Sequence, residues 1–435
     1  MIRFTRAQVQ PIGIDIGHDS IKMLQVEVSE RSLSVVAAAK RSFSEEVRSQ
    51  PQLRLAMAVE MIRQMLREEP FSGRHAVTSL PRDVVHVKNL RLPAMPVGEL
   101  EAAVQFEARN LFPFDTEQAR VQFMAAGEVR QGADVKQEVI VLAARNDDIN
   151  DFLEHMHRCG VVVDSLDVEP CGLFRSVERF IRRREDESEV HVLVDIGACR
   201  SQVLIGKGKE ITFFKPIDIG GQHLHEAVSK KLGISLSEAQ ALRVRLSDAP
   251  EVAGGGKRDP VRQAVFDAVR STMEELGREI SLCLRYYSVT FRGQRPTRLR
   301  LVGGEAADAQ LQSLLNAALT IPVETGRPLY SVDTQRMKSS DRKGMMSEWA
   351  LALGLGLRFT EGRFGPRDGK PRDPNAPRED IAPTTAEVID LNQVVRAAAG
   401  EEQTLAAIGA GGGTGAAARA PRPSTKHVPP EAMHA

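Results

Sequence analysis

The pattern of apolar and polar positions repeats one strand–turn–strand unit at two places in the chain. In the stretch 12–24, apolar residues surround the step Asp15-Ile16-Gly17. The stretch 190–205 repeats this pattern around Asp195-Ile196-Gly197. Alternation with a period of two is typical of β-strands, and a glycine step between two such runs predicts a hairpin tip. One such hairpin in each half predicts two related halves that close on one ligand.

The remaining periodicity predicts an α/β chain. Residues 12–43 are expected to form a strand meander, followed by a helix at 51–68 and a strand at 74–80. In the helix, Leu55, Val59, Ile62 and Leu66 have the spacing of one apolar stripe. Further strands are predicted at 161–168, 190–219, 298–302 and 321–323, and further helices at 147–159, 170–184, 306–319 and 347–358.

A section of different pattern interrupts the first half. Residues 81–145 predict a β-α-β-β order, which is large enough for a subdomain of its own. We therefore assign 1–80 and 146–188 to the first half, 189–222 and 298–360 to the second, and 223–297 to a helical subdomain. Residues 361–435 are rich in Pro, Gly and Ala, which predicts a disordered tail with one ordered-looking island at 385–398.

Charge and composition narrow the function classes. Lys plus Arg and Asp plus Glu number 58 each, so no overall charge favours nucleic acid as a partner. The four cysteines form no Cys-x-x-Cys pair, which argues against a zinc site and for a reduced cytoplasmic protein. The first residues lack the apolar core of a signal peptide, and no run is long enough to cross a bilayer. We expect no direct membrane insertion.

The two Asp-x-Gly tips are the main candidates for chemistry. Glycine lets backbone N–H groups turn toward phosphate oxygens, and Asp15 and Asp195 are predicted to orient a hydrated Mg²⁺ through water. Lys22 follows on the return strand, where it is expected to reach a nucleotide's phosphates. A single Asp-x-Gly step is more often an ordinary hairpin turn. Two copies together with Lys22 favour a phosphate site.

Other candidates stand at strand ends. Gly220-Gly221 and Gly303-Gly304-Glu305 each follow a β-rich run, and the second pair begins a predicted helix whose N–H groups would face a nucleotide. The alternative is a turn that needs small residues for packing. Glu169 ends a predicted strand and is the one candidate for aligning a water or a metal ion, although a plain strand-ending carboxylate is the simpler interpretation.

These stretches together resemble the actin-like ATPase superfamily, with two ribonuclease-H-like halves. The resemblance rests on DIGHDSIK at 15–22, DIGACRSQ at 195–202, VEPCGLFRS at 168–176, LVGGEA at 301–306 and ALALGLGLR at 350–358. The section 81–145 resembles the relocated subdomain of the FtsA branch. The blocks 80–115 and 217–243 are similar to the PilM family of type IV pilus proteins.

The resemblance implies a cytoplasmic scaffold of pilus assembly that binds ATP and Mg²⁺ between its halves. It adds His18, Asp19, Ser20, Ala198, Arg200 and Glu238 to the nucleotide-binding residues. It also implies that the inserted subdomain holds the cytoplasmic tail of a PilN-like bitopic inner-membrane protein, which ties the chain to that membrane. The groove expected for this tail comprises Val85, Val87, Leu90, Leu100 and Val104. The pilus motor ATPase and self-association are further contacts that it allows.

A short segment in the tail resembles the partner's own sequence. Val388, Ile389, Leu391 and Asn392 have the apolar-Asn pattern with which a PilN-type tail enters its groove. One hypothesis is that this island docks into the same groove by strand addition. The alternative is an incidental amphipathic turn in a disordered tail.

Two departures from the family pattern favour binding over efficient hydrolysis. His18 stands where a Ser or Thr is usual, and Cys199-Arg200 replace small polar residues, although Arg200 would itself donate to phosphate. The open alternatives are a small-metabolite kinase, a type II secretion-like scaffold with a degenerate site, and an FtsA-like filament former. The kinase lacks an evident base, and the other two would carry a membrane segment that this sequence does not show.

Overall fold

The computed structural model describes residues 7–360, apart from 30–31, 132–133, 182, 249–258, 292–294 and 343. The tail with its segment 388–392 lies outside the described residues. One sheet contains the first Asp-x-Gly hairpin. Its order is β15-β4-β3-β2-β5-β9, with β1 paired to β3. The strands are β1 (Gln8–Val9), β2 (Ile12–Ile16), β3 (Ser20–Val28), β4 (Leu33–Ser42), β5 (His75–Ser79), β9 (Val162–Asp167) and β15 (Val332–Asp333).

A second sheet repeats this order in the other half. Its path is β12-β11-β10-β13-β14. In both sheets an antiparallel meander of three strands is extended by parallel strands on the side of its first strand. The predicted relation of the two halves is therefore visible in the strand order. The strands are β10 (Val190–Ile196), β11 (Ser201–Lys207), β12 (Glu210–Ile217), β13 (Leu299–Val302) and β14 (Val323–Thr325).

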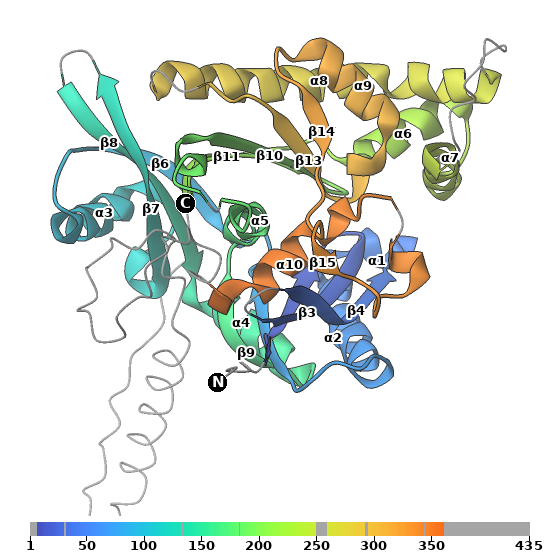
Figure 1. Ribbon diagram of the computed structural model, residues 1–435, viewed down its shortest axis with the longest axis horizontal. Helices are drawn as coiled ribbons and strands as arrows, with labels where there is room; N and C mark the ends of the chain where they lie inside the picture. The colour runs from blue at the N-terminus through green and yellow to red at the C-terminus, as the bar shows by residue number, and fades with distance from the viewer. Residues whose placement is uncertain are drawn as a thin grey trace, which may run out of the picture. The chain divides into compact units, whose positions relative to one another are not determined.

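Two helices, α5 (Glu169–Glu178) and α10 (Ala350–Gly356), fill the space between these sheets (Figure 1). Helix α10 contacts β2 and β3, α5 contacts β11 and β12, and the two helices pack on each other. Their contact needs glycine, because a Cβ on Gly354 would lie 1.6 Å from the carbonyl oxygen of Gly172. The glycines in the final helical segment therefore allow a close approach of two backbones.

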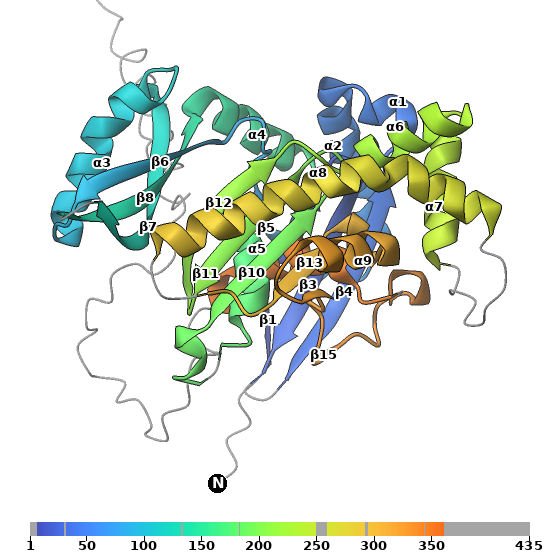
Figure 2. The same cartoon turned by 90° about the horizontal axis from the view of Figure 1, so that it is seen from above.

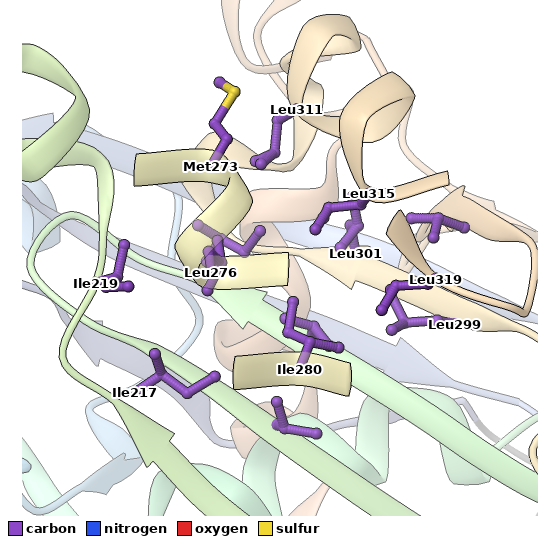
Figure 3. Close-up of a cluster of buried hydrophobic side chains, with 14 of the residues drawn as sticks. Ile217, Ile219, Met273, Leu276, Ile280, Leu299, Leu301, Leu311, Leu315 and Leu319 are labelled. Carbon is purple, nitrogen blue, oxygen red and sulfur yellow. The ribbon is translucent and has the colours of Figure 1, made fainter. Parts of the chain in front are cut away.

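The second sheet is covered on its other face by helices. The long helix α8 (Pro260–Thr290) runs across the strands, as Figure 2 shows. The Asp259 side chain caps α8 by accepting from the N–H of Val261 at 3.0 Å. Met273, Leu276 and Ile280 of α8 are buried with leucines of α9 (Ala309–Ala318) and β13 (Figure 3). Helices α6 (Gly221–Leu232) and α7 (Leu236–Asp248) pack on each other, and α6 also packs on α8.

The interrupting section forms a separate sheet of order β6-β8-β7. Its strands are β6 (His86–Pro93), β7 (Ala119–Gln131) and β8 (Asp134–Arg145), and helix α3 (Val97–Leu111) packs on one face. Strand β7 also contacts β12 of the second half. Buried Glu138 of β8 accepts from Arg91 at 2.6 Å, and Arg91 donates to Tyr286 of α8 at 2.9 Å. The section 81–145 therefore touches the second half, and its Met124 and Leu142 are buried together with Val77 of the first half.

The other elements agree in large part with the sequence. Helix α2 (Pro51–Glu68) has the predicted bounds, and its stripe residues Val59, Ile62 and Leu66 are buried. No helix in the described part of the chain is long and apolar enough to cross a membrane. The remaining elements are α1 (Glu45–Arg48), α4 (Asn146–Arg158), η1 (Thr116–Gln118), η2 (Asp186–Ser188), η3 (Gly304–Ala307), η4 (Ser339–Arg342), η5 (Ser347–Trp349) and η6 (Arg358–Thr360).

One assignment needs correction. The sequence placed all of 298–360 in the second half, whereas β15 pairs with β4 and α10 packs on β2 of the first sheet. The chain therefore returns to the first half after β14. The periodicity of a short apolar helix shows that it is buried, but it does not show which of two sheets buries it.

Candidate functional site

Two hairpin tips carry the aspartates that the sequence singled out. Asp15 lies near the end of β2 and stands opposite Lys22 on β3. Asp195 lies near the end of β10 and stands opposite Gln202 on β11. The two positions match in register, but one partner is a cation and the other a neutral amide.

The turns of the two tips are built alike. The N–H of Gly17 donates to the carbonyl oxygen of Ser20 at 3.1 Å, and the N–H of Gly197 donates to that of Arg200 at 3.1 Å. Gly303, at the end of β13, has a φ of +92°, and a Cβ there would lie 2.5 Å from Asp195 Oδ1. A side chain at this position would therefore collide with the second tip, which explains the first glycine of the Gly-Gly step.

Both tips face a cleft of about 800 Å³, within the range of small-molecule sites. Most of the residues that the sequence proposed for nucleotide binding or catalysis line this cleft. They are Asp15, Gly17, His18, Asp19, Ser20, Lys22, Glu169, Asp195, Gly197, Ala198, Arg200, Gly303, Gly304 and Glu305. The geometry thus brings residues from four distant parts of the chain to one place.

Three proposed residues do not line the cleft. Glu238 accepts from the N–H and hydroxyl of Ser235 at 2.8 Å and so caps the start of its own helix. Gly220 and Gly221 lie behind the second tip, where the N–H of Gly221 donates to the carbonyl oxygen of Gly197 at 3.0 Å. A Cβ on Gly221 would lie 2.2 Å from Glu305 Oε1. These glycines therefore serve packing, which is the alternative that the sequence left open.

The first tip carries its own ion pair. Lys22 Nζ lies 3.4 Å from Asp15 Oδ2, and both side chains are largely buried. Burial raises the pKa of the Asp15 carboxyl above its ordinary value, and the Lys22 ammonium acts in the opposite direction. The Asp15 carboxylate therefore depends on Lys22 for its charge balance.

The second tip takes its cation from another part of the chain. Arg82, in the segment between β5 and β6, donates from Nη2 to Asp195 Oδ2 at 2.7 Å and from Nε to Glu169 Oε2. Burial acts to lower the pKa of Arg82, but Glu169 and Asp195 raise it above its ordinary value. The guanidinium is therefore charged, and it joins the start of α5 to the end of β10.

Gln202 completes this arrangement. Its amide Nε2 donates to Asp195 Oδ2 at 2.9 Å and to Glu169 Oε2 at 3.2 Å. Neither Arg82 nor Gln202 was predicted from the sequence as a site residue. Arg82 follows β5, which is parallel to β2, and residues that follow parallel strands meet at the same edge of the sheet. The position of Arg82 after this strand therefore could have indicated that it lies near Asp15. It was missed because residue 81 was taken as the start of the insert.

A second arginine orders the opposite wall of the cleft. Arg243 of α7 donates from Nη2 to Glu305 and Asp308, both at 2.8 Å, and from Nη1 to His225 Nδ1 at 3.1 Å. Because an arginine has no acceptor, His225 accepts at Nδ1 and is neutral. Burial and the Arg243 charge lower the pKa of His225 to about 4.

The two halves also meet at the mouth of the cleft. Arg48, at the end of α1, donates to Asp19 at 2.6 Å and to Gln240 of α7 at 2.8 Å. This contact joins the first hairpin tip to the helices of the second half. It has no counterpart in the sequence-based candidates, which included only Asp19.

The residues that depart from the family pattern have defined environments. Burial, followed by the Arg54 charge, lowers the pKa of half-buried His18, so the imidazole is neutral near pH 7. Burial raises the pKa of the Cys199 thiol, whose Sγ lies 3.2 Å from the Gln222 side chain. Arg200 pairs with Asp218 at 3.0 Å and is about half exposed. Arg200 is the one of these three that brings a positive charge.

The expected partner groove is largely internal. Leu100 and Val104 are 1% and 0% exposed and form the core between α3 and its sheet, so the expectation that a partner contacts them is wrong in this structure. Leu90 packs on the same core, whereas Val85 and Val87 pack at the junction with the first half. An apolar helix stripe predicts burial equally well against a partner and against the element's own sheet.

Comparisons with known proteins identify the family and the fold. The model of the family described as type IV pilus assembly protein PilM matches residues 13–360. The cell division protein FtsA of Bacillus subtilis (strain 168) is 21% identical over 355 residues, which span 73% of this chain and 79% of FtsA. A solved structure described as a PilM-PilN type IV pilus biogenesis complex is 24% identical with a TM-score of 0.65. The match covers 80% of this chain and 98% of the solved chain.

The likeness to that solved structure shows the fold, and it confirms the actin-like class that the resemblance of the sequence implied. The match over 13–360 contains both hairpin tips, the cleft and the inserted sheet. The chain belongs to the PilM family of type IV pilus assembly proteins, in the actin-like ATPase superfamily that also contains FtsA.

Proposed function

We propose that this protein is a nucleotide-binding scaffold of type IV pilus assembly that takes ATP into the cleft between its halves. The observation that carries the proposal is that two hairpin tips of the same construction face one cleft of about 800 Å³. The turn N–H groups, Lys22 and Arg200 are groups that suit the oxygens of a polyphosphate. The wall formed by η3 and α7 would then face the nucleoside.

The test is calorimetric titration of the whole chain with ATP. We expect binding in the micromolar range and a loss of about tenfold in Lys22→Gln, because a buried charge-assisted contact to phosphate is removed. Lys215→Gln is the matched control, since Lys215 pairs with Glu279 outside the cleft. Absence of binding by the wild type, or equal affinity in Lys22→Gln and wild type, would contradict the proposal.

The second part of the proposal is a partner of the kind named for the solved relative. We propose that the cytoplasmic tail of a PilN-like inner-membrane protein docks where the inserted sheet meets the first half. A small apolar hollow of about 30 Å³ lies there, lined by Leu80, Val85, Leu142 and Leu166 among others. It is large enough to receive the end of one apolar side chain, which suits an anchor residue.

A labelled peptide of such a tail tests this contact by fluorescence anisotropy. Val85→Asp is expected to weaken binding at least about tenfold, because the charge would be desolvated by an apolar anchor. Val261→Asp places the same change on the exposed start of α8 and should have no effect. Thermal unfolding of both variants separates lost contact from lost fold. Full peptide affinity in a folded Val85→Asp variant would refute this site.

The remaining parts of the proposal follow from these two contacts. The protein would work in the cytoplasm and reach the inner membrane through its partner, and contacts with the motor ATPase and with itself stay predictions. Glu169 is held by Arg82 and Gln202, so it would have to leave both before it could activate a water or a substrate hydroxyl. This favours ATP binding over turnover, and it disfavours the kinase alternative.

A further inference from the structure

Four side chains form a closed set of contacts at the floor of the cleft. Glu169 and Asp195 face each other, with Arg82 and Gln202 between them. Each carboxylate directs one oxygen, Glu169 Oε2 or Asp195 Oδ2, to both nitrogen donors. The sequence predicted a hydrated Mg²⁺ oriented by Asp15 and Asp195, and Asp195 is now part of this set.

The number of free lone pairs on the two carboxylates shows whether a hydrated Mg²⁺ fits beside Asp195. A carboxylate oxygen offers about two lone pairs. Asp195 Oδ2 already accepts from Arg82 at 2.7 Å and from Gln202 at 2.9 Å. Glu169 Oε2 accepts from the same two side chains. These oxygens have no capacity left for a metal-bound water.

The other oxygen of Asp195 faces the Gly303 position. A Cβ on residue 303 would be 2.5 Å from Oδ1, so only glycine leaves this oxygen uncovered by a side chain. Within the described residues, no three His, Cys, Asp or Glu side chains are grouped to hold a metal ion. Mg²⁺ demands a nearly regular octahedron of oxygens, and Asp195 Oδ2, which already accepts from Arg82 and Gln202, has no lone pair left for one of its waters. The residues present at Asp195 therefore do not fit the expected ion.

Cations of the chain itself already neutralise two of the three carboxylate charges here. Arg82 and Lys22 bring two positive charges to the three carboxylates of Asp15, Glu169 and Asp195. A divalent cation beside the guanidinium would be repelled. Arg82 also has donors to spare, because its Nη1 makes only a long contact of 3.5 Å with the carbonyl oxygen of Arg200. This nitrogen belongs to a side chain that lines the cleft.

We infer that the cleft binds its nucleotide as the metal-free polyphosphate, with the Arg82 guanidinium in the place that a divalent cation would take. This inference rests on the proposed nucleotide function and goes beyond it by naming the ligand species and a further binding residue. Arg82 then has two roles: it neutralises Glu169 and Asp195, and it donates to a phosphate oxygen.

The test is titration of the full chain with ATP in excess Mg²⁺ and in excess EDTA. We expect the two wild-type dissociation constants to agree within about threefold. A wild-type affinity weaker by about tenfold or more in EDTA would overturn the inference and leave the proposed function intact. No binding under either condition would overturn the proposed function, and the inference with it.

Arg82→Gln sharpens the result. It frees the two carboxylate oxygens, so we expect ATP affinity in EDTA to fall about tenfold and to recover with Mg²⁺. Arg54→Gln is the matched control, because Arg54 lines the same cleft but takes no part in the Glu169–Asp195 contacts. Arg54→Gln should change the ATP affinity in Mg²⁺ and the ATP affinity in EDTA by the same factor. An Arg82→Gln variant that shows no gain in Mg²⁺ dependence over Arg54→Gln would overturn the inference.

A second measurement needs no nucleotide. Mn²⁺ is titrated into the wild-type chain and the free ion is followed by electron paramagnetic resonance. We expect no stoichiometric binding of Mn²⁺ at concentrations up to about 1 mM, so any site would have a dissociation constant in the millimolar range or weaker. One tightly bound Mn²⁺ that is lost in Asp195→Asn would show a metal site at this aspartate and overturn the inference.

Discussion

The two hairpin tips differ in where the positive charge beside the aspartate comes from. In the first tip, Lys22 of the same hairpin lies 3.4 Å from Asp15. In the second tip, Gln202 stands at the matching position, and the charge comes from Arg82 in the segment after β5. One pair is local, whereas the other joins two parts of the chain that are 113 residues apart.

This difference shows how one of two repeated hairpins can contribute both to the site and to the contact between the halves. A local pair keeps its charge balance whatever the position of the other half. The second tip is neutralised only while the segment that follows β5 of the first half, which carries Arg82, lies against it. The same carboxylate thus contributes both to the site and to the contact between the halves. Four changes test this comparison.

The largest effect is expected from Arg82→Gln. It leaves Glu169 and Asp195 mostly buried without a cation, and loss of one partner from such a set costs about 2–4 kcal/mol. About a quarter of the Arg82 side chain is exposed, which keeps the expected value below that of a fully buried pair. Urea unfolding near neutral pH measures the loss. A loss no larger than that of Lys215→Gln would contradict the cross-half role.

The second effect is a dependence of the free energy of unfolding on pH, and it comes from the two histidines that line the cleft, His225 and His18. His225 has a folded pKa of about 4 against an ordinary 6.5, so the unfolded chain binds this proton more readily. The stability that this group contributes is complete above pH 6.5 and is lost toward about pH 4, by about 3 kcal/mol. Burial and the charges of Arg243 and Arg48 lower this pKa, and Asp19 opposes them.

His225→Gln tests this effect, because glutamine keeps an acceptor for Arg243 but does not titrate. The free energy of unfolding of wild type and variant should converge as the pH falls through this window. His18→Gln is the matched change in the first half, where the pKa is also lowered. Parallel pH profiles of wild type and His225→Gln would show that His225 does not titrate as described.

A third change converts the second tip into the first. Gln202→Lys places a cation at the position that matches Lys22, next to Asp195 and Glu169. Combined with Arg82→Gln, it should restore about 1–2 kcal/mol of the stability that Arg82→Gln alone removes. Urea unfolding of the single and double variants measures this. The idea that the tips are interchangeable fails if the double variant is no more stable than Arg82→Gln.

The smallest effect is expected from the reverse change, Lys22→Gln. It should cost about 1 kcal/mol near neutral pH, because the pair is long and borders the cleft. Burial already raises the pKa of Asp15, and the loss of Lys22 raises it further. Since a protonated Asp15 needs no cation, the difference from wild type should shrink as the pH falls below neutral. Urea unfolding at a series of pH values from neutral downward measures this, and a growing difference would contradict it.

The sequence predicted the parts of this structure that depend on local pattern. Alternation predicted both hairpins, and the stripe at Val59 and Ile62 predicted α2, because burial of one face sets these periods. The order of strands then predicted the two halves. The cleft followed from the repeat, since equivalent tips at the same sheet edge converge when two halves face each other.

The rest depends on which distant segments meet. Arg82 was not predicted, because nothing in its neighbours shows that Glu169 and Asp195 will face it. Leu100 was assigned to a partner surface, since its apolar spacing does not distinguish a partner from its own sheet. Glu238 was assigned to the nucleotide through a family motif, whereas its geometry is that of a helix cap.

A double-mutant cycle between Arg82 and Asp195 tests the central claim most directly. The free energies of unfolding of Arg82→Gln, Asp195→Asn and the double variant are compared with that of the wild type. If the second tip is neutralised across the halves, the coupling energy should be about 1.5 kcal/mol or more. A coupling energy within about 0.5 kcal/mol of zero would mean that the two side chains act independently, and it would contradict the account.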